Sequence, residues 1–166
     1  MDIGIIGLGR MGANIARRLM RAGHRAVVFD RDPAAVKMVA EHGGIAATSA
    51  PDVIAKLTPP CTVWLMLPSG AVTEDSVAAM STALSEGDIL IDGGNSFFKD
   101  SVRRGQMLAG RGIRFLDVGT SGGVWGLERG YCMMIGGDKE AVDRLDPIFD
   151  CLAPGLGDIP KTPGRD

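Results

Sequence analysis

The sequence predicts an α/β fold in which a mainly parallel, doubly wound sheet is covered by helices on both faces. Short apolar runs typical of strands alternate with segments of helical periodicity, and many of the 24 glycines cluster where predicted strands end. Such alternation indicates strand–helix units joined into a parallel sheet. The length of 166 residues suits one domain, which would bury roughly 70% of the surface exposed by its unfolded form.

Boundary residues mark the first strand–helix units. An apolar run at 2–6 precedes a helix at 10–22, where apolar residues recur at helical spacing and Gly23 provides the stop. Residues 25–30 predict the second strand. The following helix runs to about residue 42 from Asp32-Pro33, because proline suits the first turn of a helix.

The middle of the chain continues the alternation. A short strand at 45–47 and a helix at 50–57 precede a strand at 63–67, which is apolar throughout. A continuous apolar run is typical of a strand covered on both faces. A helix at 72–84 and a strand around Ile89 follow.

The last third predicts a helix at 99–111, a strand at 113–118 and a seventh strand at 131–135. Asp138 is placed to cap a final helix, which Pro147 should kink or shorten.

Composition indicates where the domain ends and which classes of partner are excluded. We assign residues 1–153 to the domain and the Pro- and Gly-rich residues 154–166 to a linker or tail. The net charge of −2 provides no basic stripe for nucleic acid. No apolar run approaches the roughly 20 residues of a membrane helix, and the N-terminus lacks a signal-peptide pattern, so we expect a cytoplasmic protein with no membrane partner.

The three cysteines, Cys61, Cys132 and Cys151, lack the spacing of a zinc site or of a disulfide framework. We therefore expect buried, reduced thiols and no metal site.

The segment Gly7-Leu8-Gly9-Arg10-Met11-Gly12 has GxGxxG spacing between a predicted strand and a predicted helix. This context is the dinucleotide fingerprint of a Rossmann-type domain. Gly7 permits the tight turn, Gly9 lets the backbone approach a pyrophosphate, and Gly12 allows the helix to pack closely on the strand. The positive end of the helix would hold the phosphate charge. A glycine-rich turn without a ligand is the alternative.

Asp30 ends the second predicted strand, 18 residues after Gly12. A carboxylate at this place accepts hydrogen bonds from the adenosine ribose, which favours NAD, whereas the 2′-phosphate of NADP would face a like charge. Arg31 could pair with that phosphate. We therefore predict a preference for NAD with some tolerance of NADP.

A second polar segment, Ile91-Asp92-Gly93-Gly94-Asn95-Ser96, follows the strand around Ile89. Ligands of open parallel sheets bind outside the carboxyl ends of the strands, so we expect Asn95 and Ser96 to point at a ligand. An ordinary polar turn is the alternative.

These two segments, together with Gly119-Thr120-Ser121-Gly122-Gly123, resemble decarboxylating 6-phosphogluconate dehydrogenases. The likeness runs in order across nearly the whole chain. The segment from Ile91 to Ser96 distinguishes this family from the related β-hydroxyacid dehydrogenases. Those enzymes share the fingerprint and the Ser-Gly-Gly turn but usually have another sequence in this segment. The resemblance implies a Rossmann-type cofactor domain followed by a large helical domain, in an oxidoreductase that converts 6-phosphogluconate to ribulose 5-phosphate in the pentose phosphate pathway.

The resemblance also implies roles for individual residues. Asn95 would contact both cofactor and sugar acid, and Ser121, Gly122 and Gly123 would bind the carboxylate and hydroxyl region of the substrate. A hydroxyl beside successive backbone N–H groups can form such an anion-binding concavity. A plain glycine turn is the alternative.

Leu67, Pro68 and Ser69 match the segment that lies against the cofactor in the family. Pro68 replaces the lysine common in many members. Asp30 and Asp32 replace the Asn and the Ser or Thr of NADP-specific members, which supports the prediction of NAD.

The resemblance places the general-base lysine of the family, and the residues near it, beyond the end of this chain, which contains no Lys-x-x-His-Asn. We therefore expect no catalytic residue here and little turnover. Because a second subunit supplies part of the family's phosphate site, we expect a homodimer, and we expect an exposed apolar surface on the last strands and helix. The alternatives are the cofactor domain of a 3-hydroxyisobutyrate-type β-hydroxyacid dehydrogenase and a non-catalytic nucleotide-binding module.

Overall fold

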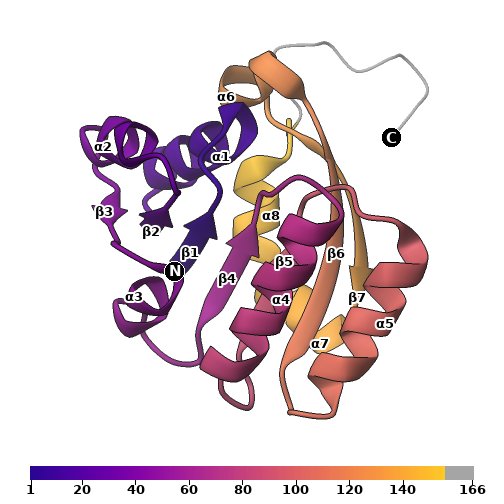
Figure 1. The fold of residues 1–166 in the computed structure, drawn as a ribbon. Helices are drawn as coiled ribbons and strands as arrows, with labels where there is room; N and C mark the ends of the chain where they lie inside the picture. Colours follow the sequence, from indigo (N-terminus) through magenta and orange to yellow (C-terminus); the bar gives the residue numbers. More distant parts are fainter. Residues whose placement is uncertain (156–166) are drawn as a thin grey trace, which may run out of the picture.

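One seven-stranded sheet organises the computed structural model, which describes residues 1–155 (Figure 1). Its order is β3-β2-β1-β4-β5-β6-β7; the first six strands are parallel, and β7 is antiparallel to β6. The order reverses at β1, which lies between β2 and β4, and this arrangement confirms the doubly wound, mainly parallel fold. The strands are β1 (Asp2–Ile6), β2 (Arg25–Phe29), β3 (Ile45–Ala46), β4 (Thr62–Leu65), β5 (Ile89–Asp92), β6 (Arg114–Ser121) and β7 (Cys132–Gly137).

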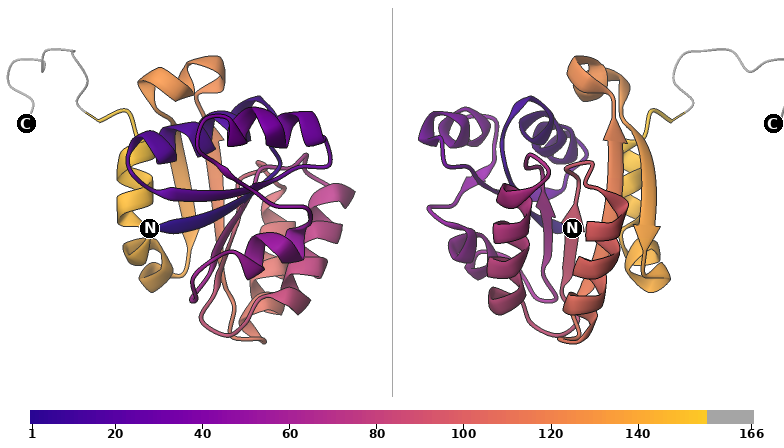
Figure 2. Two further views of the ribbon diagram at one scale, coloured as in Figure 1. Left: turned by 90° about the vertical axis from the view of Figure 1, so that its left-hand side faces the viewer. Right: turned by 45° about the vertical axis from the view of Figure 1, so that its right-hand side comes forward.

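Helices cover both faces of the sheet, as predicted (Figures 1 and 2). One face carries α1 (Arg10–Arg21), α2 (Pro33–Ala40), α7 (Lys139–Arg144) and α8 (Asp146–Leu152). The other face carries α3 (Ala50–Ala55), α4 (Ala71–Ala83) and α5 (Phe98–Ala109). The 3-10 turn η1 (Gly123–Trp125) and α6 (Gly126–Arg129) connect β6 to β7.

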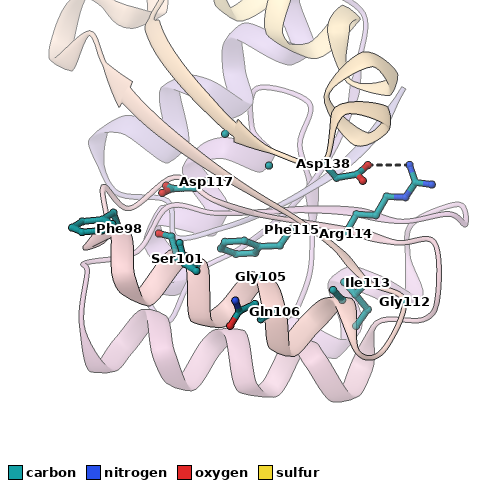
Figure 3. Close-up of a pocket in the computed structure, with 14 residues that line it drawn as sticks. Phe98, Ser101, Gly105, Gln106, Gly112, Ile113, Arg114, Phe115, Asp117 and Asp138 are labelled. Atoms are coloured by element: carbon teal, nitrogen blue, oxygen red, sulfur yellow. Dashed lines mark hydrogen bonds and ion pairs between the residues drawn. The ribbon is translucent and has the colours of Figure 1, made fainter.

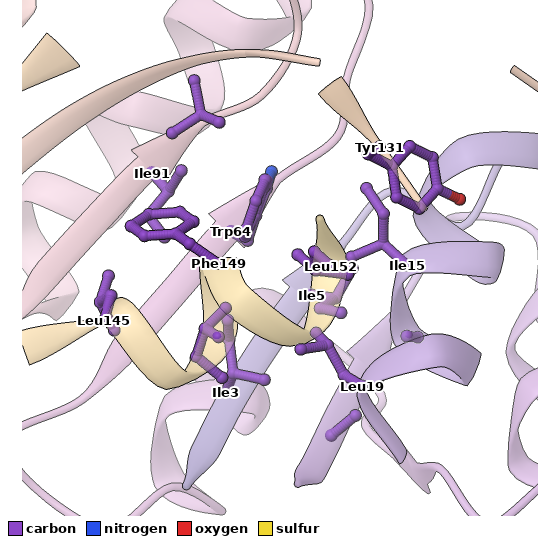
Figure 4. Packing of buried hydrophobic residues seen from close by; sticks show 14 of the residues in the cluster. Ile3, Ile5, Ile15, Leu19, Trp64, Ile91, Tyr131, Leu145, Phe149 and Leu152 are labelled. Carbon is purple, nitrogen blue, oxygen red and sulfur yellow. The ribbon is translucent and has the colours of Figure 1, made fainter. Parts of the chain in front are cut away.

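Each face has its own apolar core, because side chains of a strand alternate between the two sides of a sheet. In β4, Trp64 packs in the core that contains α1 and α8, whereas Val63 and Leu65 belong to the opposite core. The Trp64 ring meets Phe149 of α8 edge-on, with centroids 6.2 Å apart (Figure 4). The sheet is therefore buried on both sides.

Two elements differ in extent from the sequence predictions. β6 continues to Ser121 rather than to residue 118, because Gly119, Thr120 and Ser121 pair with the antiparallel strand β7. The single helix predicted after Asp138 is two helices, α7 and α8, with Pro147 in the first turn of α8. Proline lacks the N–H that a continuing helix would need, which confirms the predicted interruption.

The expectation of buried thiols is wrong for one cysteine. Cys61 is buried and Cys151 half-buried, but Cys132 is exposed because it lies on the side of β7 opposite to Met133, which packs against the core. All three are free thiols.

Exposed apolar side chains gather near the carboxyl end of β5 and beyond β6, not on the last helix. Phe97 and Phe98 begin α5, and Trp125 of η1 is 63% exposed with the Arg129 guanidinium 5.0 Å from its ring centroid. The expected apolar surface is present on the last strand, where Met134 of β7 is 61% exposed. For the last helix the expectation is wrong, since α8 buries Ile148 and Leu152 against the sheet.

None of the helices in residues 1–155 combines the length and apolar character needed to cross a membrane. Most of the tail predicted at 154–166 lies outside the described residues.

Arg18 ties the ends of two later helices to α1. Its guanidinium donates to the carbonyl oxygens of Cys151 (2.8 Å), Leu127 (3.1 Å) and Ala153 (3.0 Å). Carbonyls in the last turn of a helix have no partner within the helix, so a cation that bonds them offsets their desolvation. Arg18 thereby fixes α6 and α8 beside α1.

We expect Arg18→Ala to lower the free energy of unfolding by about 2 kcal/mol or more, since several charge-assisted hydrogen bonds are lost together. Arg21→Ala is the matched control, because the Arg21 side chain is 51% exposed and pairs with Glu128 on the surface; its effect should stay within about 0.5 kcal/mol. Urea unfolding measures both. Equal effects would contradict a special role for Arg18.

Candidate dinucleotide-binding site

A hollow of about 700 Å³ opens at the carboxyl end of β1, where the strand order reverses. Its walls come from the segments that follow β1, β2 and β4, and from one side of α4. Six residues predicted to bind a cofactor line it: Gly7, Gly9, Asp30, Arg31, Leu67 and Pro68. The structure thus brings together residues that lie far apart in the sequence.

The turn between β1 and α1 is shaped by close backbone packing. A Cβ atom at Gly12 would clash with the Gly7 carbonyl oxygen and lie 3.2 Å from Cβ of Met66, whereas a Cβ at Gly9 would meet nothing within 4 Å. Gly12 is therefore required by the protein itself, and the free space beside Gly9 faces the hollow.

The first turn of α1 suits an anion. It contains no acidic residue, and the N-cap Gly9 offers no side-chain hydrogen bond to the free N–H groups. These groups and the helix dipole make this end positive. Arg10 is exposed at the start of α1, and Met11 packs partly against the core.

The Asp30 carboxylate bonds the turn after β1 and the turn after β2. Its Oδ2 accepts a hydrogen bond from the Leu8 amide at 2.5 Å, and its Oδ1 accepts one from the Asp32 amide at 2.8 Å. A carboxylate has about four acceptor positions, so capacity remains for a ligand hydroxyl. Leu8 is buried and its N–H is used, so its contribution to a cofactor site is steric.

Asp32 and Arg31 lie differently, although they are neighbours. The Asp32 side chain caps α2 by accepting from the Ala34 amide at 2.9 Å, which gives this residue a structural role outside the hollow. Arg31 is exposed on the rim of the hollow.

One wall of the hollow escaped prediction. Helix α4 contributes Val72, Asp75, Ser76, Ala79 and Met80. These positions recur at helical spacing on one side of α4, a periodicity that could have identified the wall. The wall is mainly apolar, as expected for a surface that receives a flat ring.

The loop from Leu67 to Gly70 leads into α4. Pro68 lines the hollow, and its carbonyl oxygen accepts a 2.8 Å hydrogen bond from Oγ1 of Thr73 in the first turn of α4. Ser69 is exposed and is not among the residues that line the hollow.

Asn95 lies over a separate, shallower hollow of about 430 Å³, which Asp117, Gly119 and Met134 also line. Its φ is +53°, a left-handed conformation that asparagine tolerates better than most residues. Its Oδ1 accepts a 3.2 Å hydrogen bond from the Thr120 amide. Oδ1 keeps a second acceptor position and Nδ2 is a donor, so Asn95 can offer a ligand either group.

Ser96 lines the same hollow as Asn95, and its hydroxyl is bonded within the protein. The Oγ donates to Oδ2 of Asp92 at 2.6 Å and accepts from Nη1 of Arg104 at 3.0 Å. Buried charges therefore hold this hydroxyl at the border of the hollow.

The Ser-Gly-Gly turn follows directly from the strand that Asn95 contacts. Ser121 ends β6 and is exposed, one residue after Thr120, and Gly122 and Gly123 lead into η1. Tyr131 packs beneath Gly122, and burial raises the pKa of its phenol to about 12. The structure therefore places Ser121 and Asn95 at neighbouring points on the same edge of the sheet.

A third hollow, of about 600 Å³, lies between α5 and strands β6 and β7 (Figure 3). Phe98, Val102 and Phe115 form apolar walls, and Asp117 borders both this hollow and the one near Asn95. None of the predicted site residues is among those that line it.

Comparison with known proteins agrees with this geometry. A family sequence model described as the NAD binding domain of 6-phosphogluconate dehydrogenase matches residues 2–157. The chain belongs to the 6-phosphogluconate dehydrogenase family. Residues 2–157 are thus an NAD(P)-binding domain of an oxidoreductase family, which confirms the resemblance given by the three sequence segments.

Relatives of this chain in the 6-phosphogluconate dehydrogenase family are longer. The NAD(+)-dependent, decarboxylating 6-phosphogluconate dehydrogenase of Haloferax volcanii is 40% identical over 155 residues, which cover 93% of this chain and 51% of that protein. The chain therefore spans about half the length of this relative.

Solved structures give the same picture. The 6-phosphogluconate dehydrogenase of Plasmodium falciparum is similar with a TM-score of 0.87 and 28% identity, over 96% of this chain and 36% of that chain. The 3-hydroxyisobutyrate dehydrogenase of Mycobacterium tuberculosis has a TM-score of 0.85 and 30% identity, over 92% of this chain and 52% of that chain. The two types of dehydrogenase share this fold.

We expect Gly9→Ala to weaken NAD binding and Gly12→Ala to lower the stability of the fold. The backbone of Gly9 (φ −58°, ψ −177°) suits alanine and its surroundings are open, so stability should change by less than about 0.5 kcal/mol, while a methyl facing the pyrophosphate should weaken NAD binding by about tenfold or more. Gly12→Ala should lower the free energy of unfolding by about 2 kcal/mol through overpacking. Thermal unfolding and calorimetric NAD titration measure the two effects; the reverse pattern would contradict the assignment.

Glu74, in the first turn of α4, generates a pH prediction. Bonds to the guanidinium of Arg103, with a smaller contribution from Arg104, lower the pKa of Glu74 to about 2. A depressed pKa stabilises the fold fully above the unfolded value of about 4.3, and this stabilisation is lost as pH falls toward 2. The stability difference between the wild type and Glu74→Gln should therefore be constant above pH 5 and shrink below it.

Urea unfolding at pH 7, 5, 4 and 3 measures this difference. Glu41→Gln is the control, since Glu41 is exposed and 4.0 Å from Lys37, and a surface pair of this kind contributes little. A Glu74 effect that stays constant from pH 5 to pH 3 would contradict the prediction.

Proposed function

We propose that this chain binds NAD in the hollow between β1 and α4 and forms the cofactor-binding part of a 6-phosphogluconate dehydrogenase. The observation that carries the proposal is the hollow itself, which combines the Gly7–Gly12 turn, the free positive end of α1 and the Asp30 carboxylate at one switch point. The pyrophosphate would lie at the start of α1, with the adenine against the apolar side of α4.

The preference for NAD over NADP rests on charge. Asp30 and Asp75 both line the hollow, whereas Arg31 on its rim is the residue that would favour a 2′-phosphate. A phosphate close to a carboxylate costs on the order of 1 to 4 kcal/mol at effective dielectrics of 80 to 20. The name of the Haloferax relative specifies NAD(+), and the Plasmodium structure is described with NADP+. For this chain, the carboxylate of Asp30 supports binding of NAD rather than NADP.

The nicotinamide end would reach Asn95. Its free Nδ2 can donate to an oxygen of the cofactor or of the sugar acid. Ser121 and the backbone of Gly122 and Gly123 would receive the carboxylate region of 6-phosphogluconate next to it. This arrangement would present C3 of the substrate for hydride transfer, after which loss of CO₂ from the β-keto acid gives ribulose 5-phosphate.

Proton transfer would need residues other than those described around Asn95. Among the side chains that line its hollow, Asp117 is the titratable one, and it belongs to β6. General acid–base groups contribute typically 10²- to 10⁴-fold to a rate. Because the general-base lysine motif of the family has no match in these 166 residues, we propose that they alone bind cofactor but reduce little of it. The complete enzyme, acting as a homodimer in the pentose phosphate pathway, would supply the base.

A β-hydroxyacid dehydrogenase is the rival, favoured by the similarity to the Mycobacterium tuberculosis enzyme. The polar segment from Ile91 to Ser96 supports the first proposal instead. Adding 6-phosphogluconate or 3-hydroxyisobutyrate to the NADH-loaded chain separates the two, because the rival requires the smaller acid to bind. NADH binding without binding of either acid would favour a non-catalytic nucleotide-binding module.

We expect isothermal calorimetry to give a lower Kd for NAD than for NADP. Asp30→Asn should narrow the ratio of the two constants by about tenfold, because one like-charge repulsion of the 2′-phosphate is removed. Asp75→Asn is the matched control on the α4 wall and should change the ratio less. Tighter binding of NADP by the wild type would refute the preference for NAD.

A further inference from the structure

Arg104 is a buried cation that bonds Glu74 of α4 and Ser96 of the loop after β5. It lies in α5 and its side chain is 1% exposed. Its partners are two carboxylates: Nη1 is 3.0 Å from Oδ2 of Asp92, which is also 1% exposed, and Nε is 2.9 Å from Oε2 of Glu74. An ion pair as deeply buried as Arg104–Asp92 is stable only when its geometry is well satisfied.

One side of this pair holds the loop that presents Asn95. Nη1 of Arg104 also donates to Oγ of Ser96 at 3.0 Å, and Oδ1 of Asp92 accepts from the Gly94 amide at 2.9 Å. The residues before and after Asn95 are therefore both bonded to the buried pair. Asn95 itself has the left-handed φ of +53°, a conformation that needs support from its surroundings.

The other side reaches the loop that borders the cofactor hollow. Glu74 belongs to the first turn of α4, and the adjacent Thr73 bonds the carbonyl oxygen of Pro68 at 2.8 Å. One guanidinium thus bonds Ser96 of the loop after β5 and Glu74 of α4, and Glu74 is adjacent to the residue that bonds the loop after β4.

We propose that Arg104 is a positioning residue that sets where Asn95 stands relative to the cofactor hollow. The proposal rests on the proposed function, because Asn95 matters only if a dinucleotide binds there. A guanidinium donates from Nε and Nη1 in fixed directions, so it serves Glu74 and the Asp92–Ser96 pair at once. A lysine retains the charge but offers a single nitrogen and loses this fork.

The test compares Arg104→Lys with Arg103→Lys in the 166-residue chain. Arg103 is the matched control: it bonds Glu74 at 2.8 and 2.7 Å from a half-exposed position, with no bond to Asp92 or Ser96. We expect Arg104→Lys to raise the Kd for NADH, measured by fluorescence titration, by on the order of tenfold. Arg103→Lys should stay within about twofold.

Hydrogen exchange supplies a readout that needs no cofactor. The Thr120 amide bonds Oδ1 of Asn95 and the Gly94 amide bonds Asp92, so both should exchange faster in Arg104→Lys while the core amide of Leu90 does not. Unchanged exchange at Thr120 and Gly94, or equal effects of the two lysine variants on NADH affinity, would overturn the proposal. If the wild type bound no NADH, the proposed function would fail, and exchange would still decide the role of Arg104.

Ser96→Ala keeps the test decisive if Arg104→Lys does not fold. It removes the hydroxyl that joins the loop to the pair and leaves both charges in place. Faster exchange at Thr120 with weaker NADH binding supports the positioning role, and wild-type values for both refute it.

Discussion

The pairing of β1 with both β2 and β4 is the constraint on which the candidate site depends. Parallel strands need crossover connections, and the crossovers that leave β1 and β4 go to opposite faces: α1 covers one face and α4 the other. Between the two helices the carboxyl ends of β1 and β4 are left uncovered. Because β1 is buried along both edges and on both faces, the turn that follows it is held rigidly.

Charge in this domain is organised in two layers. The upper layer is the positive end of α1 and the carboxylate of Asp30, both beside the hollow. The lower layer is the Arg104–Asp92 pair, out of reach of solvent. Removing one partner of such a pair leaves an uncompensated buried charge and costs about 3 to 5 kcal/mol. Asn95 can therefore stay exposed, because this satisfied network bonds the residues on either side of it.

Local signals in the sequence predicted what depends on local structure. The spacing of Gly7, Gly9 and Gly12 and the position of Asp30 were sufficient to locate the mouth of the hollow. The side of α4 was missed because its role depends on which face meets the sheet. The partners of the Ser96 hydroxyl could not be predicted because one of them, Arg104, lies eight residues later. The length of β6 was underestimated because its last three residues are strand only through pairing with β7.

The two tryptophans lie in opposite environments, which gives the chain two separate optical signals. Trp64 is fully buried against Phe149, in the core that forms when the sheet and α8 meet. Trp125 is exposed two residues after Gly123, with a guanidinium over its ring. A soluble quencher reaches the second indole and not the first. Emission that resists quenching therefore reports the integrity of the core, and the quenchable part reports events at the Ser-Gly-Gly turn.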